Sequence, residues 1–226
     1  MPELSVFADA ESVAQAAADY LASQISACVN ARGVCHVALP GGSTPARCLE
    51  LLSQQDLPWQ KIHWYLGDER CYPVGHEERN DRMIERQLWS RIDAPAQTRH
   101  PIAAELGPQQ AAKHYAGLID AVGRLDIVVL GMGEDGHTAS LFPENSALDS
   151  DDSVVAVYHA PKPPAERVTL GLKTIQSAEQ RIVLVSGSGK REALNQIERG
   201  VKLPISRIGP SSWFVDEAAA PDANGI

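Results

Sequence analysis

Residues 126–143 place the strongest constraint on how this chain folds. They open with residues 126–130, in which Asp126 leads into an apolar run whose length and β-branched content predict a fully buried parallel strand. Closely spaced glycines follow and permit a tight turn. Because ligands of open α/β sheets bind beyond the carboxyl ends of the strands, the turn predicts a carboxylate, Asp135, and an imidazole, His137, over a crevice. A tight turn with a surface histidine explains the same spacing equally well.

Five further apolar runs have the length of strands, and segments with helical spacing lie between them. This alternation predicts an α/β fold, a mostly parallel, Rossmann-like open sheet with helices on both faces. No composition shift or long linker divides the chain, so residues 1–226 are predicted to form a single domain. The further strands are predicted at residues 34–39, 62–66, 154–157, 181–186 and 212–215, and helices at 10–31, 81–89, 109–122 and 191–199.

The formal net charge of −9 argues against broad binding to nucleic acid. The amino end lacks the basic start and apolar core of a signal peptide, and no apolar run has the length of a membrane span, so a cytoplasmic protein without membrane contact is predicted. The four cysteines lie far apart without a Cys-X-X-Cys pair. They predict small buried side chains rather than a zinc ribbon or a disulfide framework.

The loop of residues 40–45, Pro-Gly-Gly-Ser-Thr-Pro, joins a predicted strand to a predicted helix. Thr44 suits the helix cap and Pro45 the first helical position, so backbone N–H groups would gather where the helix dipole favours an anion such as phosphate. A well-capped turn without a ligand is the alternative, since the loop does not match the P-loop pattern. The loop also lacks the Gly-X-Gly-X-X-Gly fingerprint, so no nicotinamide or flavin cofactor is predicted.

Two basic residues follow other predicted strands. Arg70 closes the triplet Asp68-Glu69-Arg70, where its planar fork suits a phosphate or an oxyanion, although an ion pair with a neighbouring carboxylate is favoured for an isolated triplet. Lys190 follows a glycine turn at a helix start, a poor place for a cation unless an anion binds there; a solvated lysine is the more common outcome.

The remaining segments predict connections. Residues 76–82 are heavily charged and predict a solvated loop, and residues 91–107 predict a surface connection. Residues 161–164, Pro-Lys-Pro-Pro, predict an extended loop before residues 167–172, which lead into another helix. The tail, residues 216–226, is predicted to fray at its end.

Taken together, these motifs resemble the 6-phosphogluconolactonase family, which shares its fold with glucosamine-6-phosphate deaminases and ribose-5-phosphate isomerases. One departure is that Arg79-Asn80 stands where the family usually has Ser-Asn, which puts any role of that serine in doubt. The matching blocks span residues 39–45, 67–70, 131–143, 167–170 and 187–190, in that order over most of the chain.

The resemblance implies roles for individual residues of the matching blocks. Gly41, Gly42, Ser43, Thr44 and Lys190 would hold the sugar phosphate. Arg70 and Arg167 would face the substrate, and His137 with Asp135 would serve the ring opening, with Asp68 and Asn80 in support and no metal or other cofactor.

The activity implied is hydrolysis of 6-phospho-D-glucono-1,5-lactone to 6-phospho-D-gluconate, the second step of the oxidative pentose phosphate pathway. Glucose-6-phosphate dehydrogenase would supply the lactone. A deaminase or isomerase on the same fold is the nearest alternative, because deaminases also carry Asp-Gly-His. A non-enzymatic sugar-phosphate sensor is the alternative of another class, and no pattern specifies an oligomeric state.

Overall fold

The computed structural model describes residues 3–222. Its main sheet has seven strands in the order β1-β10-β9-β6-β2-β3-β5, and every neighbouring pair is parallel. In chain order the elements are β1 (Leu4–Phe7), α1 (Ala10–Arg32), β2 (Cys35–Leu39), α2 (Ser43–Leu52), β3 (Ile62–Leu66), β4 (Asp68–Arg70), α3 (Asn80–Gln87), β5 (Arg99–His100), α4 (Pro108–Val122), β6 (Ile127–Gly131), β7 (Val154–Val157), β8 (Arg167–Leu170), α5 (Leu172–Ser177), β9 (Gln180–Val185), α6 (Arg191–Glu198) and β10 (Ser212–Asp216).

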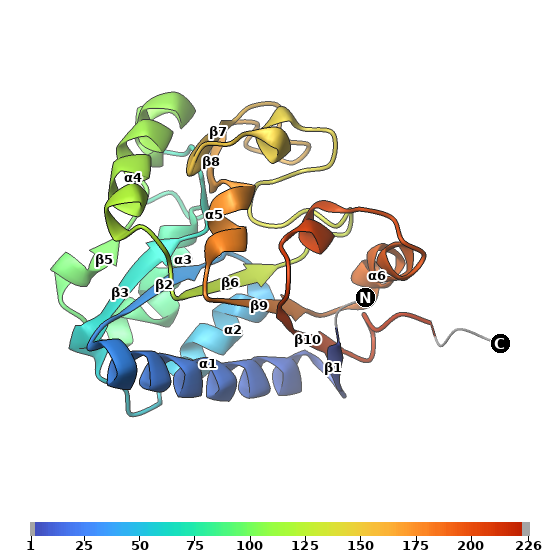
Figure 1. Cartoon of the computed structure of the whole chain (residues 1–226), viewed down its shortest axis with the longest axis horizontal. Helices are drawn as coiled ribbons and strands as arrows, with labels where there is room; N and C mark the ends of the chain where they lie inside the picture. Colours follow the sequence, from blue (N-terminus) through green and yellow to red (C-terminus); the bar gives the residue numbers. More distant parts are fainter. Residues whose placement is uncertain (1–2, 223–226) are drawn as a thin grey trace.

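Helices cover both faces of this sheet, which confirms the predicted fold class. Helices α1 and α2 pack against each other below the sheet in Figure 1, and α4 and α5 lie above it. Helix α1 follows its sequence signals closely, since the Asp9 side chain accepts the Ser12 N–H at its start and Gly33, with a φ of 80°, ends it. None of the helices within residues 3–222 is long and apolar enough to cross a membrane.

Two strands of the main sheet were missed because neither has a buried apolar run. The edge strand β1 has no fully buried residue, and β5 consists of Arg99 and His100 alone. Strand β5 lies inside residues 91–107, which were predicted to form a surface connection. This prediction is wrong in part, because Ile102 and Ala104 are fully buried.

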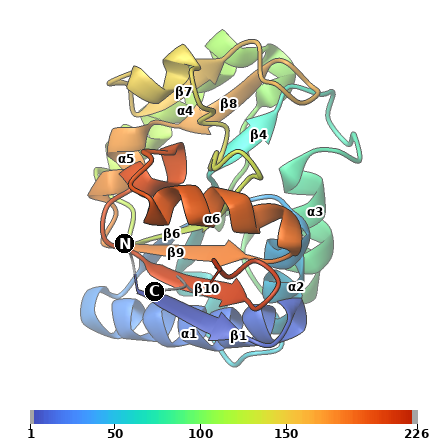
Figure 2. The same ribbon diagram turned by 90° about the vertical axis from the view of Figure 1, so that its right-hand side faces the viewer.

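A second, antiparallel sheet of three strands, β4-β8-β7, lies on the side of α4 and is not predicted by the sequence (Figure 2). Its register places Asp68 opposite Thr169 and Arg70 opposite Arg167. Residues that are about a hundred positions apart in sequence are thereby brought to one end of the main sheet.

Two helix starts differ from the prediction. Helix α2 begins at Ser43 with Gly42 as its cap, so Thr44 lies in the first turn instead of capping the helix. Helix α3 begins at Asn80, and Arg79 and Asn80 are buried, so the predicted solvated loop at 76–82 is wrong at these two positions. In the tail, Ala219 is buried and donates its N–H to Asp216, while residues 223–226 lie outside the described residues.

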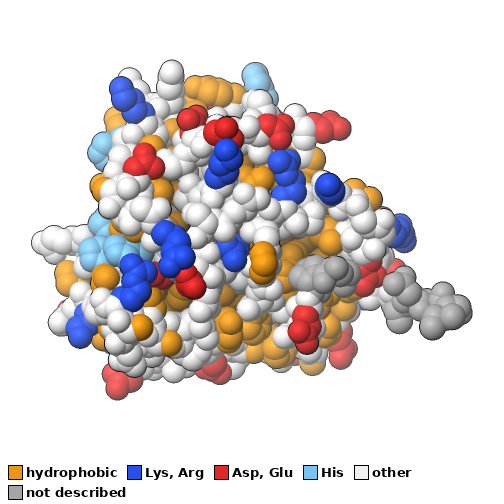
Figure 3. Space-filling model, in the orientation of Figure 1, with side chains coloured by type: hydrophobic (Ala, Val, Ile, Leu, Met, Phe, Trp, Pro, Cys, Tyr) orange, Lys and Arg blue, Asp and Glu red, His pale blue; other side chains and the backbone are white. Residues whose placement is uncertain are grey.

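Three histidines and a tyrosine form a cluster on adjacent strands. His63 Nδ1 and His100 Nε2 share a hydrogen bond of 3.0 Å, and His36 Nδ1 lies 3.2 Å from the hydroxyl of Tyr65. Figure 3 shows histidine side chains gathered on the side where β3 and β5 lie. Burial lowers the pKa of all three histidines, and the charges of His63 and His36 help to lower that of His100 to about 4.

This cluster is expected to make the fold sensitive to acid. A histidine in the unfolded chain has a pKa near ~6.5, above that of folded His100, so the unfolded state binds more protons as the pH falls between the two values and stability decreases. His100→Gln is expected to remove roughly 1–3 kcal/mol of the difference in unfolding free energy between about pH 7 and about pH 4. Denaturant titrations measure it, with exposed His114→Gln as control; an unchanged difference would contradict this origin.

Candidate active site

A cavity of about 470 Å³ lies at the carboxyl ends of the central strands of the main sheet and is lined mainly by polar side chains. The structure therefore brings together residues that the sequence left in separate motifs. Of the residues predicted from sequence, its lining includes Gly41, Gly42, Ser43, Thr44, Asp68, Arg70, Asn80, His137, Arg167 and Lys190.

Asp135 lies behind His137 and is not part of the lining. The His137 ring nitrogen Nδ1 lies 2.5 Å from Asp135 Oδ1, which also accepts the backbone N–H of His137 at 3.1 Å. Burial would raise the pKa of Asp135, but the hydrogen bond and the charge of His137 outweigh it and lower this pKa to about 2. An ionised Asp135 holds the proton of the ring on Nδ1, which leaves Nε2 as the proton acceptor at the cavity.

Gly133 lets the imidazole approach the turn. A Cβ atom at this position would lie 2.0 Å from His137 Nδ1 and 2.7 Å from Asp135 Oδ1. The turn is closed by two backbone hydrogen bonds, from Gly133 N–H to His137 O and from Gly136 N–H to Gly133 O. Gly136 has a φ of 74°, which favours glycine. The glycines are therefore requirements of this Asp135–His137 geometry.

The glycine loop before α2 forms another part of the cavity lining. Gly42 has a φ of 106°, and a Cβ at Gly41 would lie 2.0 Å from Asn80 Oδ1, so the loop passes close to the start of α3. The Thr44 hydroxyl hydrogen-bonds to that of Ser186 at the end of β9. Since the first N–H groups of a helix have no acceptor within it, this end of α2 can bind an anion.

Lys190 lines the cavity beside this loop and is only half-buried, with no ion pair among the side chains that the structure describes. Burial lowers the pKa of its ammonium group, against the opposing charge of Glu134, while Lys162 lowers it further. A fully solvated lysine does not fit this position. Its location favours an anionic ligand as the partner.

The two arginines on β4 and β8 differ in what they bind. Arg70 forms no ion pair with Asp68 or Glu69 within residues 3–222, contrary to the alternative favoured from sequence; its guanidinium donates to the carbonyl of Glu78. Arg167 is buried, and its guanidinium carbon Cζ lies 5.5 Å from the centroid of the Phe142 ring. It donates to three backbone carbonyls, those of residues 162–164. Arg167 thus fixes the proline loop more than it presents donors to the cavity.

That proline loop supplies a residue that sequence reasoning missed. Lys162 lines the cavity with Lys190, and its charge acts on the Lys190 ammonium group. The signal was present in the sequence as a lysine between prolines, but it predicted only an extended loop. A second cation at the cavity increases the attraction for a doubly charged phosphate.

Asp68 and Asn80 support the floor of the cavity. The Asn80 amide donates to Asp68 O at 2.9 Å and to Asp68 Oδ1 at 3.1 Å, and the Ser140 hydroxyl donates to Asp68 Oδ2 at 2.6 Å. Glu69 is fully buried, where it accepts N–H groups of residues 70, 80 and 81. Burial raises its pKa to about 7.

A family model described as "Glucosamine-6-phosphate isomerases/6-phosphogluconolactonase" matches residues 8–216 of the chain. The chain belongs to this family. A 6-phosphogluconolactonase from Mycobacterium tuberculosis is 36% identical, with 96% of each chain covered, and one from Synechocystis is 33% identical, with 96% of this chain and 97% of that one covered. The crystal structure of 6-phosphogluconolactonase from Thermotoga maritima has a TM-score of 0.90 and 27% identity over 96% of this chain and 100% of that one.

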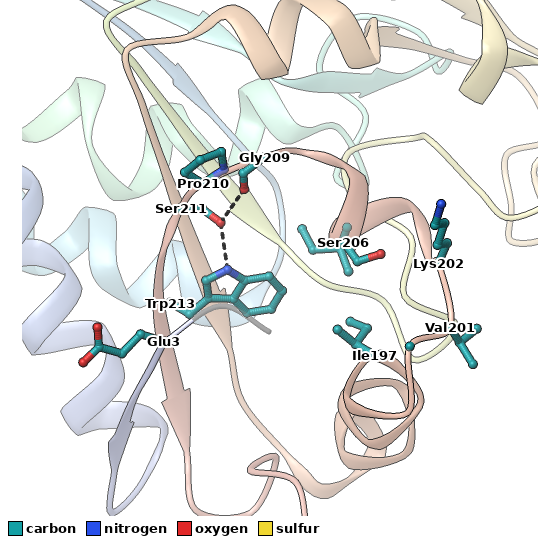
Figure 4. A pocket seen from close by; sticks show the side chains of 11 residues that line it. Glu3, Ile197, Val201, Lys202, Ser206, Gly209, Pro210, Ser211 and Trp213 are labelled. Atoms are coloured by element: carbon teal, nitrogen blue, oxygen red, sulfur yellow. Dashed lines mark hydrogen bonds between the residues drawn. The ribbon is translucent and has the colours of Figure 1, made fainter.

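Another hollow, of about 570 Å³, lies at the amino end of β10, away from the residues that match the family motifs (Figure 4). There the indole of Trp213 donates to the Ser211 hydroxyl at 2.8 Å, which itself donates to the carbonyl of Gly209. Charged side chains in its lining are limited to Glu3 and Lys202 among the described residues. It has no acid–base pair comparable to that of Asp135 and His137.

One group of potential metal ligands lies at the amino ends of the strands, opposite the cavity. The ligand atoms of Cys28, Cys35 and Asp126 lie within 4.8 Å of one another. Both oxygens of Asp126 are already engaged, by the Arg32 guanidinium and the N–H of His36, and burial raises the pKa of both thiols. These contacts fit a packed core better than a metal centre.

Proposed function

We propose that this member of the family hydrolyses 6-phospho-D-glucono-1,5-lactone to 6-phospho-D-gluconate, the second step of the oxidative pentose phosphate pathway. The observation that carries the proposal is that His137, paired with Asp135, lines the same cavity as the start of α2, where the free N–H groups of a helix favour an anion. A lactone with a remote phosphate needs both features at once. The curated relatives are named for this activity.

In the proposed mechanism, Nε2 of His137 takes a proton from water, and the resulting hydroxide attacks the C1 carbonyl. The tetrahedral intermediate collapses by breaking the bond from C1 to the ring oxygen, which receives the proton back from His137. The products are a carboxylic acid, which ionises, and a free hydroxyl. Asp135 stays ionised because its pKa is about 2, so it stabilises the imidazolium that forms transiently.

The phosphate is proposed to bind at the start of α2, with Lys190 and Lys162 as cations of the same cavity lining. Arg70 is proposed to stabilise the oxyanion, because its guanidinium lines the cavity without a carboxylate partner in the described part of the chain. Binding energy from the phosphate then positions C1 against His137. Asp68 is proposed to support Asn80 rather than act as a base, since both its oxygens accept hydrogen bonds.

The experiment that tests the function is a turnover assay of the purified protein. The phosphorylated lactone, glucosamine 6-phosphate and ribose 5-phosphate are supplied separately, and spontaneous lactone opening is subtracted. Turnover of the lactone alone supports the proposal, whereas turnover of either other substrate favours a deaminase or an isomerase. Binding of 6-phosphogluconate without any turnover would favour a sensor.

The proposed cellular setting follows from the substrate. The lactone forms when glucose-6-phosphate dehydrogenase oxidises its substrate, so we propose that this enzyme supplies the substrate of the chain. We also propose that the chain acts in the cytoplasm and that residues 1–226 form a single domain. The polar cavity and the net charge of −9 agree with a small anionic substrate held at a local basic site.

Lys190→Ala is expected chiefly to raise KM for the phosphorylated lactone. A charge-assisted hydrogen bond contributes about 1.5–3 kcal/mol, which corresponds to roughly a 10–100-fold change. Initial rates with phosphorylated and unphosphorylated lactone measure the effect, and exposed Lys113→Ala on α4 is the matched control. If the Lys190 variant discriminates between the two lactones as well as the parent does, Lys190 does not bind the phosphate.

A further inference from the structure

Arg79 is not part of the cavity lining, although both of its neighbours in the sequence are, and its side chain is only 2% exposed. Its Nε and Nη2 bind the carboxylate of Asp81 at 2.6–3.1 Å, and Nη2 also donates to the carbonyl of Ile102 at 2.9 Å. Its Nη1 donates to the carbonyl of Tyr72 at 3.0 Å and to the carboxylate of Glu105 at 2.9 Å. One guanidinium therefore ties together the loop after β4, the connection before α4 and the first turn of α3.

The residues on either side of Arg79 both reach the cavity. The carbonyl of Glu78 accepts the hydrogen bond of the Arg70 guanidinium. The amide of Asn80 binds Asp68 and lies against Gly41 of the glycine loop. A contact that fixes the backbone at Arg79 therefore also fixes Glu78, which holds the Arg70 guanidinium, and Asn80, which lies against the glycine loop.

The shape of the guanidinium matters here as well as its charge. Arg79 reaches two carboxylates and two carbonyls through a planar fork, and Glu69 Oε2 lies 4.0 Å from its Nε. A lysine carries the same charge, but its ammonium group cannot donate hydrogen bonds to all four of these acceptors in the same geometry. Arg79→Lys therefore separates the loss of geometry from the loss of charge.

We infer that Arg79 is a positioning residue for the reaction, which acts by holding Arg70 and Asn80 at the cavity without touching the substrate. The inference rests on the proposed function, because turnover is its main readout.

The test is a double-mutant cycle on kcat/KM. Arg79→Lys is expected to lower kcat/KM about tenfold in the parent but only about twofold in a protein that already carries Arg70→Lys, because position 70 then has no guanidinium to hold and only the effect through Asn80 remains. Arg82→Lys is the matched control: it lies three residues further on, in α3, with its side chain 51% exposed and its nearest carboxylate, that of Glu77, 3.9 Å away. It is expected to keep parental rates.

Equal losses on both backgrounds would assign Arg79 a general structural role and overturn the inference, as would parental kcat/KM in folded Arg79→Lys. If that variant does not fold, Glu105→Ala removes one acceptor of Arg79 from a side chain that is 32% exposed, and the same cycle applies. A parent without turnover contradicts the proposed function instead. The cycle is then measured on the Kd for 6-phosphogluconate, where additive losses would overturn the inference.

Discussion

His137→Gln is expected to leave a folded protein that binds 6-phosphogluconate but turns over the lactone with a kcat lowered by about 10²–10⁴-fold, the usual contribution of a general base. Glutamine fills a similar space and retains polar atoms, yet it cannot take a proton from water. Steady-state rates measure kcat, and calorimetry with 6-phosphogluconate measures binding. Exposed His114→Gln is the control for the loss of a histidine.

The pH profile of the same variant identifies the base. In the parent, kcat/KM should fall on the acid side, because a protonated imidazole cannot accept a proton. Glu69, whose pKa burial raises to about 7, could produce a similar fall by disturbing the start of α3. A fall that disappears in His137→Gln belongs to the imidazole, and one that persists belongs to another group. Near-parental turnover in the folded variant would direct the search to Asp135, Glu134 or Asp68.

The parts of the site that could be predicted are those in which a single segment contains both the structural element and the functional residues. A buried strand, closely spaced glycines, Asp135 and His137 lie within a dozen residues, so periodicity and turn chemistry place them together. The same holds for the glycine loop before α2. The predicted Thr44 cap failed by two positions, because the helix already begins at Ser43, directly after Gly42.

The parts that could not be predicted depend on contacts between distant segments. The pairing of β4 with β8 decides that Arg70 and Arg167 lie side by side, and neither strand is long enough to predict a partner. Arg79 was assigned to solvent because its neighbours are charged, yet the carboxylates of Asp81 and Glu105 make its burial possible. Lys162 lines the cavity from a loop whose carbonyls are held by Arg167.

Contacts with backbone carbonyls nearby in the sequence explain why carboxylates do not neutralise the arginines at the cavity. The cations at the cavity are held largely through backbone carbonyls: Glu78 O binds Arg70, and the carbonyls of residues 162–164 bind Arg167. Carbonyl acceptors fix a guanidinium without cancelling its charge. The cavity of an acidic protein can thus retain a local positive potential for an anionic substrate.

Gly133→Ala is expected to cause a loss of kcat close to that of His137→Gln, although it leaves both catalytic side chains in the sequence. The added Cβ would lie 2.0 Å from His137 Nδ1 and 2.1 Å from its Cε1, so the imidazole has to leave its place beside Asp135. A displaced general base loses up to about 10²–10⁴-fold in rate. Gly117→Ala on α4 is the control, because nothing lies within 4 Å of a Cβ there and Gly117 is not part of the cavity lining.

The decisive measurement for this prediction combines the two substitutions. If the methyl group acts by displacing His137, Gly133→Ala should lower kcat in the parent by a large factor but have almost no effect in a protein that already carries His137→Gln, since effects on one catalytic unit are not additive. A large further loss in the double variant would mean that the methyl group damages the turn itself. Full activity of Gly133→Ala would instead show that His137 works from a position other than the one beside Asp135, and the proposed role of Asp135 would have to be abandoned.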